Sequence, residues 1–246
     1  RHRLLPLRSH LVGAYNRSRL SPYLYMASIC IADFSSPKAS SNSVSITPTE
    51  AAEYAQCEAI LLDMLQDLSR ITFSFLQSSE DFQSHPDVIE ELFFMASKMV
   101  QCCPKSFVGK FDLLHSYVQC AIAGMDLDHK DANRGIMNFL ETVVGYGLTL
   151  RDSLDSSSNG SSGNDMTALK ECKDSLERVI ITEGKSIVTK LLQALAGNLP
   201  CYRITANGNN GSIAGILYKL NQLLSPGLLS SWVTEALMVV EQQQTS

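Results

Sequence analysis

The sequence predicts an all-α protein, a right-handed superhelix of paired helices of the HEAT or armadillo type. Apolar residues recur at spacings of three and four along most of the chain, and Pro repeatedly stands where a helix would begin. The expected helices alternate as hairpins of roughly 40 to 50 residues, the length of a HEAT-type repeat. Because no hairpin can bury its apolar face alone, neighbouring hairpins must stack. A closed helical bundle is the competing architecture.

Nine helices are expected. The first covers about 4–15, and the second begins at Ser21-Pro22, with Ser21 as the cap and Pro22 at the first helical position. A Ser-rich stretch, 35–46, predicts a surface loop. Thr47 to Glu50 form a capping box that begins a long helix reaching about residue 76.

The second half of the chain continues this pattern. A helix begins at Pro86 and stops at Pro104, and two further helices are expected over 107–122 and from Asp128 onward. The low-complexity stretch 152–165 predicts a second loop. A long helix over about 166–198 follows, in which Gly184 indicates a bend or break. The last two helices are expected over 213–224 and from Ser225-Pro226 onward.

Composition and motifs argue against several classes of protein. Hydrophobic residues make up 45% of the 246 residues and charged residues 18%, as in folded globular proteins. No stretch is long and apolar enough to span a membrane. The seven cysteines include no CxxC pair or zinc spacing, which predicts reduced thiols and no metal site. No nucleophile elbow, P-loop or dinucleotide-binding motif occurs, so we expect neither an enzyme nor a cofactor.

The stretch LDHKDAN is the one segment with a chemical appearance. Asp128, His129 and Asp131 suggest a metal site or an acid–base pair. However, they stand at a helix start, where Asp128 can cap free N–H groups and Asp131 suits the helix dipole. The structural interpretation is favoured, and the same holds for His85 beside Pro86.

Charge patterning gives the candidate partner sites. Five Arg residues precede the first acidic residue, and all 25 acidic residues lie in the remainder, which disfavours nucleic-acid binding and suits a basic protein partner. Arg1 and Arg8 share a helix face and could bind an acidic or phosphorylated segment. Asp87 and Glu91, four residues apart, could receive a basic segment, as could the pair at 63 and 67. A solvated helix face is the alternative for each pair.

Four segments together carry a family resemblance. They are SPYLYMASI at 21–29, LLDMLQ at 61–66, HPDVIEELF at 85–93 and LDHKDAN at 127–133. In this order and spacing they resemble the C-terminal repeats of importin-β-family nuclear transport receptors of the transportin 3 and importin 13 type. We therefore expect residues 1–246 to be a segment of four to five helical hairpins from a longer receptor.

The resemblance implies a carrier that binds protein cargo and shuttles between nucleus and cytoplasm. Cargo of such receptors includes arginine–serine-rich or other basic nuclear proteins, and nucleoporins and RanGTP are further partners, RanGTP through repeats N-terminal to this stretch. The concave cargo wall is expected from the helices that start near Pro22, Pro86, Asp128 and Asn210. A generic HEAT scaffold without a transport role is the alternative.

Overall fold

A computed structural model describes residues 3–35, 47–156, 163–199 and 213–244. Over these ranges the chain forms eleven α-helices and no strand, and none of the helices is long and apolar enough to cross a bilayer. The helices are α1 (Leu4–Ser18), α2 (Pro22–Phe34), α3 (Pro48–Phe75), α4 (Ser79–Ser84), α5 (Pro86–Cys102), α6 (Pro104–Val108), α7 (Phe111–Gly124), α8 (Lys130–Ser156), α9 (Gly163–Leu195), α10 (Ile213–Leu223) and α11 (Pro226–Gln244).

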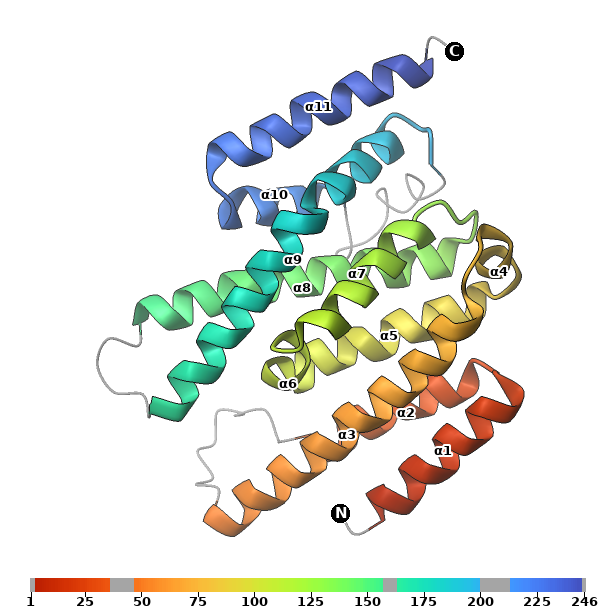
Figure 1. Ribbon diagram of the computed structural model, residues 1–246, viewed down its shortest axis with the longest axis vertical. Coiled ribbons are helices and arrows are strands. Elements are labelled where there is room, and N and C mark those ends of the chain that lie inside the picture. The colour runs from red at the N-terminus through yellow and green to blue at the C-terminus, as the bar shows by residue number, and fades with distance from the viewer. Residues whose placement is uncertain (1–2, 36–46, 157–162, 200–212, 245–246) are drawn as a thin grey trace.

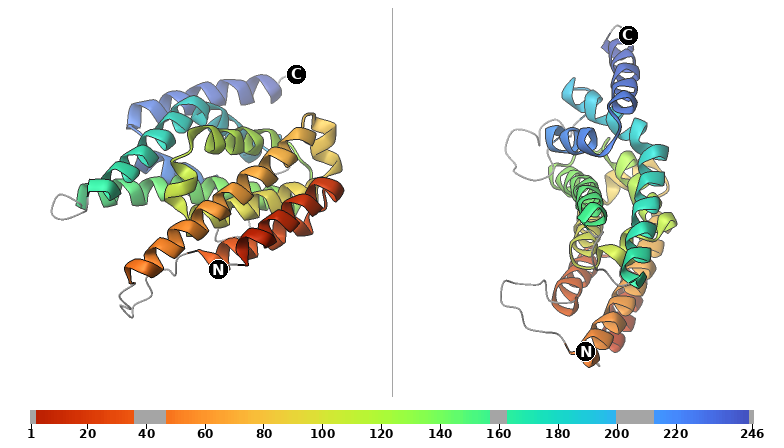
Figure 2. Two further views of the ribbon diagram at one scale, coloured as in Figure 1. Left: turned by 60° about the horizontal axis from the view of Figure 1, so that its bottom comes forward. Right: turned by 90° about the vertical axis from the view of Figure 1, so that its left-hand side faces the viewer.

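The long helices stack in two layers (Figures 1 and 2). Helices α2, α5, α8 and α10 lie side by side in one layer, and α1, α3, α7, α9 and α11 form the other. The short helix α6 packs between α3 and α9 in the second layer. Each hairpin contributes one helix to each layer, which confirms the all-α solenoid class. The four helices expected to form the cargo wall do share one layer.

Helices begin at the prolines as the sequence predicts, but one predicted N-cap hydrogen bond is absent. Pro22, Pro48 and Pro86 each occupy the first turn of a helix, as predicted. The capping box of α3 is confirmed: the Glu50 backbone N–H donates to Thr47 Oγ1 at 3.3 Å, and the Thr47 N–H donates to Glu50 Oε2 at 2.9 Å. The prediction that Ser21 caps α2 was wrong, because its side chain makes no capping hydrogen bond.

Two short helices and the helix ends correct the sequence-based picture. Nine helices were expected, but α4 and α6 are additional. Helix α4 begins with its own capping box, Ser78 with Asp81, and Pro104 starts α6 where the sequence predicted only an end. The loop predicted over 152–165 is also too long, because 152–156 belong to α8 and 163–165 to α9, while 157–162 lie outside the described residues. Of the loop predicted over 35–46, only Ser35 is described.

An aromatic cluster joins the two layers. Tyr117 of α7 is fully buried, and its ring lies 5.3 to 6.2 Å, between centroids, from four others. These four rings are Phe73 of α3, Phe93 of α5, Phe107 of α6 and Phe139 of α8. The Tyr117 hydroxyl shares a 2.6 Å hydrogen bond with Ser69 Oγ, which also donates to the Leu65 carbonyl. The cluster therefore ties five helices together without leaving its buried hydroxyl unpaired.

Gly184 does not interrupt α9, so the break that the sequence suggested as one alternative is absent. The helix runs without interruption from Gly163 to Leu195. The glycine instead permits close packing, because a Cβ at position 184 would lie 2.5 Å from Trp232 Cζ3 of α11. Trp232 is only 7% exposed, so the glycine lets a large indole cover α9.

We expect Gly184→Ala to destabilise the protein by about 1–3 kcal/mol, because the added methyl overpacks the contact with Trp232. The matched control is Gly145→Ala in α8, where a Cβ meets Lys219 only at an ordinary 3.7 Å. There the helix propensity of Ala should raise stability by about 0.5–1 kcal/mol. Chemical denaturation measures both changes, and equal stabilisation by the two substitutions would contradict the packing role.

Candidate functional site

A groove of about 420 Å³ lies across three successive helices of the first layer. Its walls come from α2, α5 and α8, so residues more than a hundred positions apart in the sequence meet there. The lining residues are Tyr25, Glu90, Glu91, Phe94, Asp131, Arg134, Gly135 and Asn138. Of the predicted acidic pair, Glu91 lines the groove and Asp87 is not among its lining residues. The cargo wall expected from these helices stays a prediction.

Gly135 sets the distance between α5 and α8 beside this groove. A Cβ at position 135 would lie 3.2 Å from the Glu90 carbonyl oxygen and 3.6 Å from Phe93 Cβ. A larger side chain would have to push the helices apart. The close approach brings the first turn of α8, with Asp131 and Arg134, next to the carboxylate of Glu90.

The polar end of the groove holds more negative than positive charge. Arg134 Nη2 lies 2.9 Å from Asp131 Oδ1 and 3.8 Å from Glu90 Oε1, so one guanidinium serves two carboxylates. Burial and the nearby charge of Asp131 raise the pKa of Glu90, and Arg134 only partly offsets them. The lining residues of the groove thus include three carboxylates, at Glu90, Glu91 and Asp131, and one guanidinium, at Arg134.

Glu91 is the least compensated of these carboxylates. Its Oε2 atom is inaccessible to solvent and has no hydrogen-bond partner. Burial first, and then the charges of Glu90 and Asp87, raise the pKa of Glu91 above its ordinary value. A buried carboxylate oxygen without a partner is costly to the folded state.

The other end of the groove is aromatic and exposed. The rings of Tyr25 and Phe94 stack with their centroids 6.4 Å apart and an interplanar angle of 22°, and they are 47% and 37% exposed. Met26 and Ile29 extend this apolar surface along α2 at 46% and 43% exposure. The signal in the sequence was the run from residue 24 to 34, which is apolar over more of the helix than one buried stripe can cover.

Sequence reasoning did not single out Tyr25, Phe94, Glu90 or Arg134 as a site, and it assigned Asp131 to the helix dipole. Each of these residues fits an ordinary helix when considered alone. Their convergence depends on how three hairpins stack, which one chain without contact information does not reveal.

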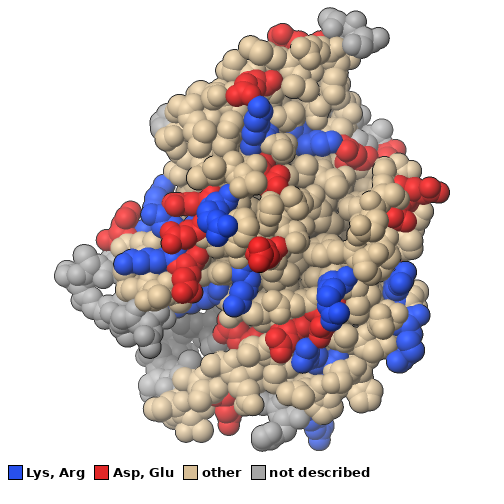
Figure 3. Space-filling view, viewed as in Figure 1, with Lys and Arg blue, Asp and Glu red and all other residues tan. Residues whose placement is uncertain are grey.

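Arg8, the described member of the basic pair, lies on the opposite layer and has intramolecular partners. Arg8 of α1 donates to Asp67 Oδ2 of α3 at 2.7 Å and lies 3.7 Å from Asp63. Burial acts to raise the pKa of Asp67, but the hydrogen bonds from Arg70 and Arg8 outweigh it and lower that pKa. Figure 3 shows acidic and basic side chains interspersed over this layer. Partner binding by Arg8 stays a prediction, and Arg1 lies outside the described residues.

The residues of LDHKDAN lie at the start of α8, and capping by Asp128 stays a prediction. His129 Nδ1 accepts the backbone N–H of Ala132 at 3.2 Å, so the imidazole caps one N–H group in the first turn of α8. Asp131 lies in the first turn of α8, as expected. Within the described ranges, no group of three or more His, Cys, Asp or Glu side chains is arranged to hold a metal ion.

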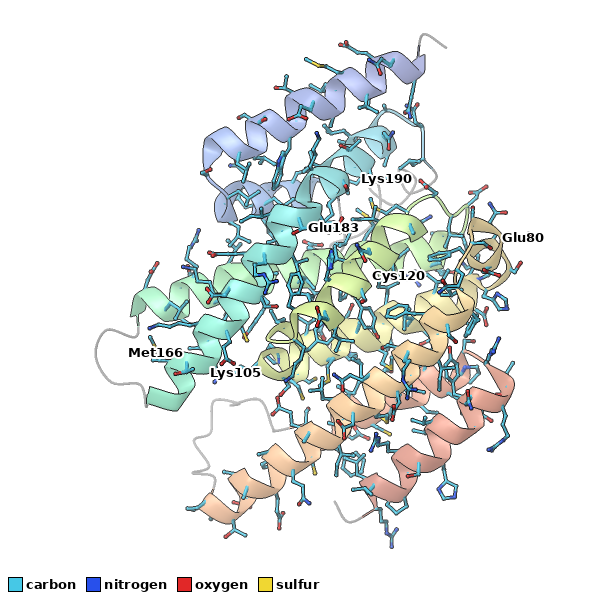
Figure 4. The ribbon with its side chains drawn as sticks, viewed as in Figure 1. Glu80, Lys105, Cys120, Met166, Glu183 and Lys190 are labelled. Carbon is cyan, nitrogen blue, oxygen red and sulfur yellow. The ribbon has the colours of Figure 1, made fainter. Side chains whose placement is uncertain are left out.

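His115 of α7 makes a structural contact with α9, within the second layer. Its Nε2 lies 2.7 Å from Glu183 Oε1 of α9, which also accepts a hydrogen bond from Gln119 at 3.0 Å. Figure 4 shows Glu183 and Lys190 on α9 beside α7, and Lys190 pairs with Asp126 at 2.5 Å. These contacts hold α7 against α9.

A second cavity of about 270 Å³ lies between α8, α9 and the start of α11. Its walls are mainly aliphatic, including Leu150, Ile180 and Leu228. The charges at its rim are already satisfied within the chain: Lys173 pairs with Glu177, and Arg151 donates to the Gln222 carbonyl. The groove across α2, α5 and α8 is therefore the stronger candidate for recognition.

Comparison with known proteins gives a similarity to a transportin. No protein-family model matches the sequence. The chain is 25% identical over 148 residues to Transportin MOS14 of Arabidopsis thaliana. The match covers 60% of this chain but only 14% of that transportin, so the chain spans a small part of the length of its relative. The similarity indicates a transportin-like relationship and does not distinguish among branches of such receptors.

We expect Glu91→Gln to be at least as stable as the wild type at pH 7, with a Tm higher by about 1–2 °C once solvent screening is allowed for. A raised folded-state pKa means that the stability contributed by Glu91 is fully present below its ordinary pKa of 4.5 and is lost as the pH rises through the folded-state pKa. The difference in Tm should therefore shrink as the pH falls toward 4.5.

Thermal melts over this pH range test the assignment. Asp174→Asn, which removes the same charge from an exposed position on α9, is the matched control. A Gln variant that melts below the wild type at every pH would contradict the view that Glu91 is an uncompensated carboxylate.

Proposed function

We propose that this chain forms part of a nuclear transport receptor that binds protein cargo, with arginine–serine-rich or other basic nuclear proteins as the cargo class. The similarity to a transportin, together with the stacked-hairpin fold, supports this role. The observation that carries the cargo class is the groove across α2, α5 and α8, which combines excess negative charge with exposed aromatic rings. Such a surface complements a basic protein segment.

The proposed mechanism is binding and release, without chemistry. The groove is built by three successive hairpins, so a change in the twist between hairpins changes the spacing of its walls. RanGTP bound to another part of the receptor would favour a twist with lower affinity for cargo. Nucleoporins are the further partners of this proposal, which places the protein in both nucleus and cytoplasm.

The competing function is a helical scaffold that organises a larger complex. The same groove would serve it, because recognition of a basic segment does not by itself require Ran. The two functions differ in whether binding responds to RanGTP, and that difference is measurable.

We expect the full-length protein, immobilised and incubated with nuclear extract, to bind basic nuclear proteins that are released by Ran locked in its GTP form. Ran locked in its GDP form is the control and should release little. Quantitative mass spectrometry of the bound fraction provides the measurement. A bound set that does not change with the nucleotide state of Ran would reject the transport role and leave the scaffold.

A further inference from the structure

The corner between α1 and α2 carries a serine hydroxyl that is not used by the fold. Ser21 precedes Pro22, the first residue of α2, and its side chain makes no capping hydrogen bond. The carbonyl oxygen of Ser21 does take part in the helix, because it accepts the N–H groups of Leu24 and Tyr25. The backbone of Ser21 therefore supports the first turn of α2, whereas its partly exposed side chain adds nothing to it.

The same corner holds positive charge that the chain does not neutralise. Arg17 and Arg19, four and two residues before Ser21, are exposed, and neither makes an ion pair within the described ranges. The guanidinium carbon of Arg19 lies 4.9 Å from the centre of the Phe75 ring, and Arg17 extends back along α1 beside Gly13. Figure 3 shows basic side chains at the edge of the molecule where α1 ends. Both arginines are long enough to turn toward an anion at Ser21.

Arg19 also has an unfavourable backbone conformation. Its φ is 53° and its ψ is 29°, and it is the one non-glycine residue of the described ranges with a positive φ. A residue with a Cβ disfavours this region, so the corner opens locally at a lower cost than a relaxed turn does. Local opening would present Ser21 as an extended segment, which is the form that protein kinases accept.

We propose that Ser21 is a phosphorylation site whose phosphate binds the side chains of Arg17 and Arg19. A protein kinase would transfer the γ-phosphoryl group of ATP to Ser21 Oγ. The bond between Oγ and phosphorus forms as the bond from phosphorus to the bridging oxygen of ATP breaks, ADP leaves, and the hydroxyl proton is released. The inference goes beyond the proposed function and holds whether or not the protein is a transport receptor.

Ser21 differs from the other candidates of its kind. A Ser or Thr also precedes Pro at Ser36, Thr47 and Ser225, but none of these three has a basic residue among the four residues before it. The Thr47 hydroxyl is already bonded to Glu50, whose carboxylate would repel a phosphate. Ser36 lies outside the described residues. Ser21 alone combines the following proline with two preceding arginines.

The consequence of the modification follows from the charges. A phosphoserine carries about −1.5 to −2 charge units at pH 7 and three strong hydrogen-bond acceptors. An anion at the start of α2 is favoured by the helix dipole, and guanidinium groups pair with phosphate through parallel hydrogen bonds. The phosphate would therefore hold the start of α2 to the end of α1, and would add negative charge one turn before Tyr25 of the groove.

The first experiment treats the complete chain with ATP and a proline-directed kinase of the MAP-kinase class, and maps the modified residues by mass spectrometry. We expect phosphate on Ser21. Ser21→Ala should remove it without unfolding the protein, because the hydroxyl that it deletes makes no capping bond. The matched control is Ser225→Ala, which removes another exposed serine before Pro and should leave Ser21 modified. Absence of phosphate from Ser21 in the folded wild type would overturn the proposal.

The second experiment measures whether the phosphate binds the arginines. We expect phosphorylation of the wild type to raise Tm by about 2–4 °C, with a smaller gain at high salt. Ser21→Ala treated with the same kinase reports the effect of phosphate at any other residue and should show no such gain. The double variant Arg17→Gln, Arg19→Gln should lose about half of the gain or more, because only the helix dipole then remains.

Intact-mass spectrometry allows the wild type and the double variant to be compared at equal occupancy of Ser21, and circular dichroism verifies that each is folded. A gain in Tm that persists in Ser21→Ala, or that is the same with and without the two arginines, would reject the proposed contact. Neither experiment involves Ran or cargo, so failure here and failure of the transport function are separate results.

Discussion

The buried ring of Tyr117 is the contact on which the rest of the structure depends. It is the point where α7 of one layer meets α5 and α8 of the other, and Phe73 and Phe107 extend the contact to α3 and α6. A tyrosine here needs a partner for its hydroxyl, and Ser69 supplies one from within α3. The hydrogen bond between Ser69 and Tyr117 fixes the rotation of α3 relative to α7. Apolar packing alone would define the relative position of these two helices less specifically.

The groove inherits its geometry from this core. Phe93 points inward to the ring cluster, whereas its neighbour Phe94 is exposed on the groove surface, so one packing contact orients both sides of α5. Phe139 positions α8 in the same way, and Gly135 allows it to approach α5 closely enough for Arg134 to meet Glu90. The arrangement of the groove residues is therefore set by residues buried in the core.

Much of the fold could be predicted from the sequence because its signals are local. Apolar spacing and Pro at helix starts gave the long helices, and the Thr47–Glu50 capping box gave the start of α3 to the residue. The short helices α4 and α6 were missed because one to two turns are too few to show a period. The extent of the loop at 152–165 was overestimated because Ser-rich composition does not fix where a helix ends.

The candidate site was predicted only in part, for a related reason. The spacing of Asp87 and Glu91 on one helix face is local and was recognised, but the contributions of Tyr25 and Arg134 depend on contacts between hairpins. Arg8 illustrates the same limit from the other side: it looked available for a partner in the sequence, yet its carboxylate partner Asp67 lies 59 residues away. Pairing between distant segments is a property of the stack and leaves no periodic trace in a single chain.

The two seams of the groove are not equally stiff. Between α5 and α8, the backbone of Gly135 packs against the backbone of Glu90, and the two helices cannot approach more closely there. Between α2 and α5, the surface contact is a stacked pair of half-exposed rings, which can slide while remaining in contact. If the superhelix coils or uncoils, we expect the displacement to occur mainly where the rings of Tyr25 and Phe94 meet. The spacing of α5 and α8 at Gly135 would change less.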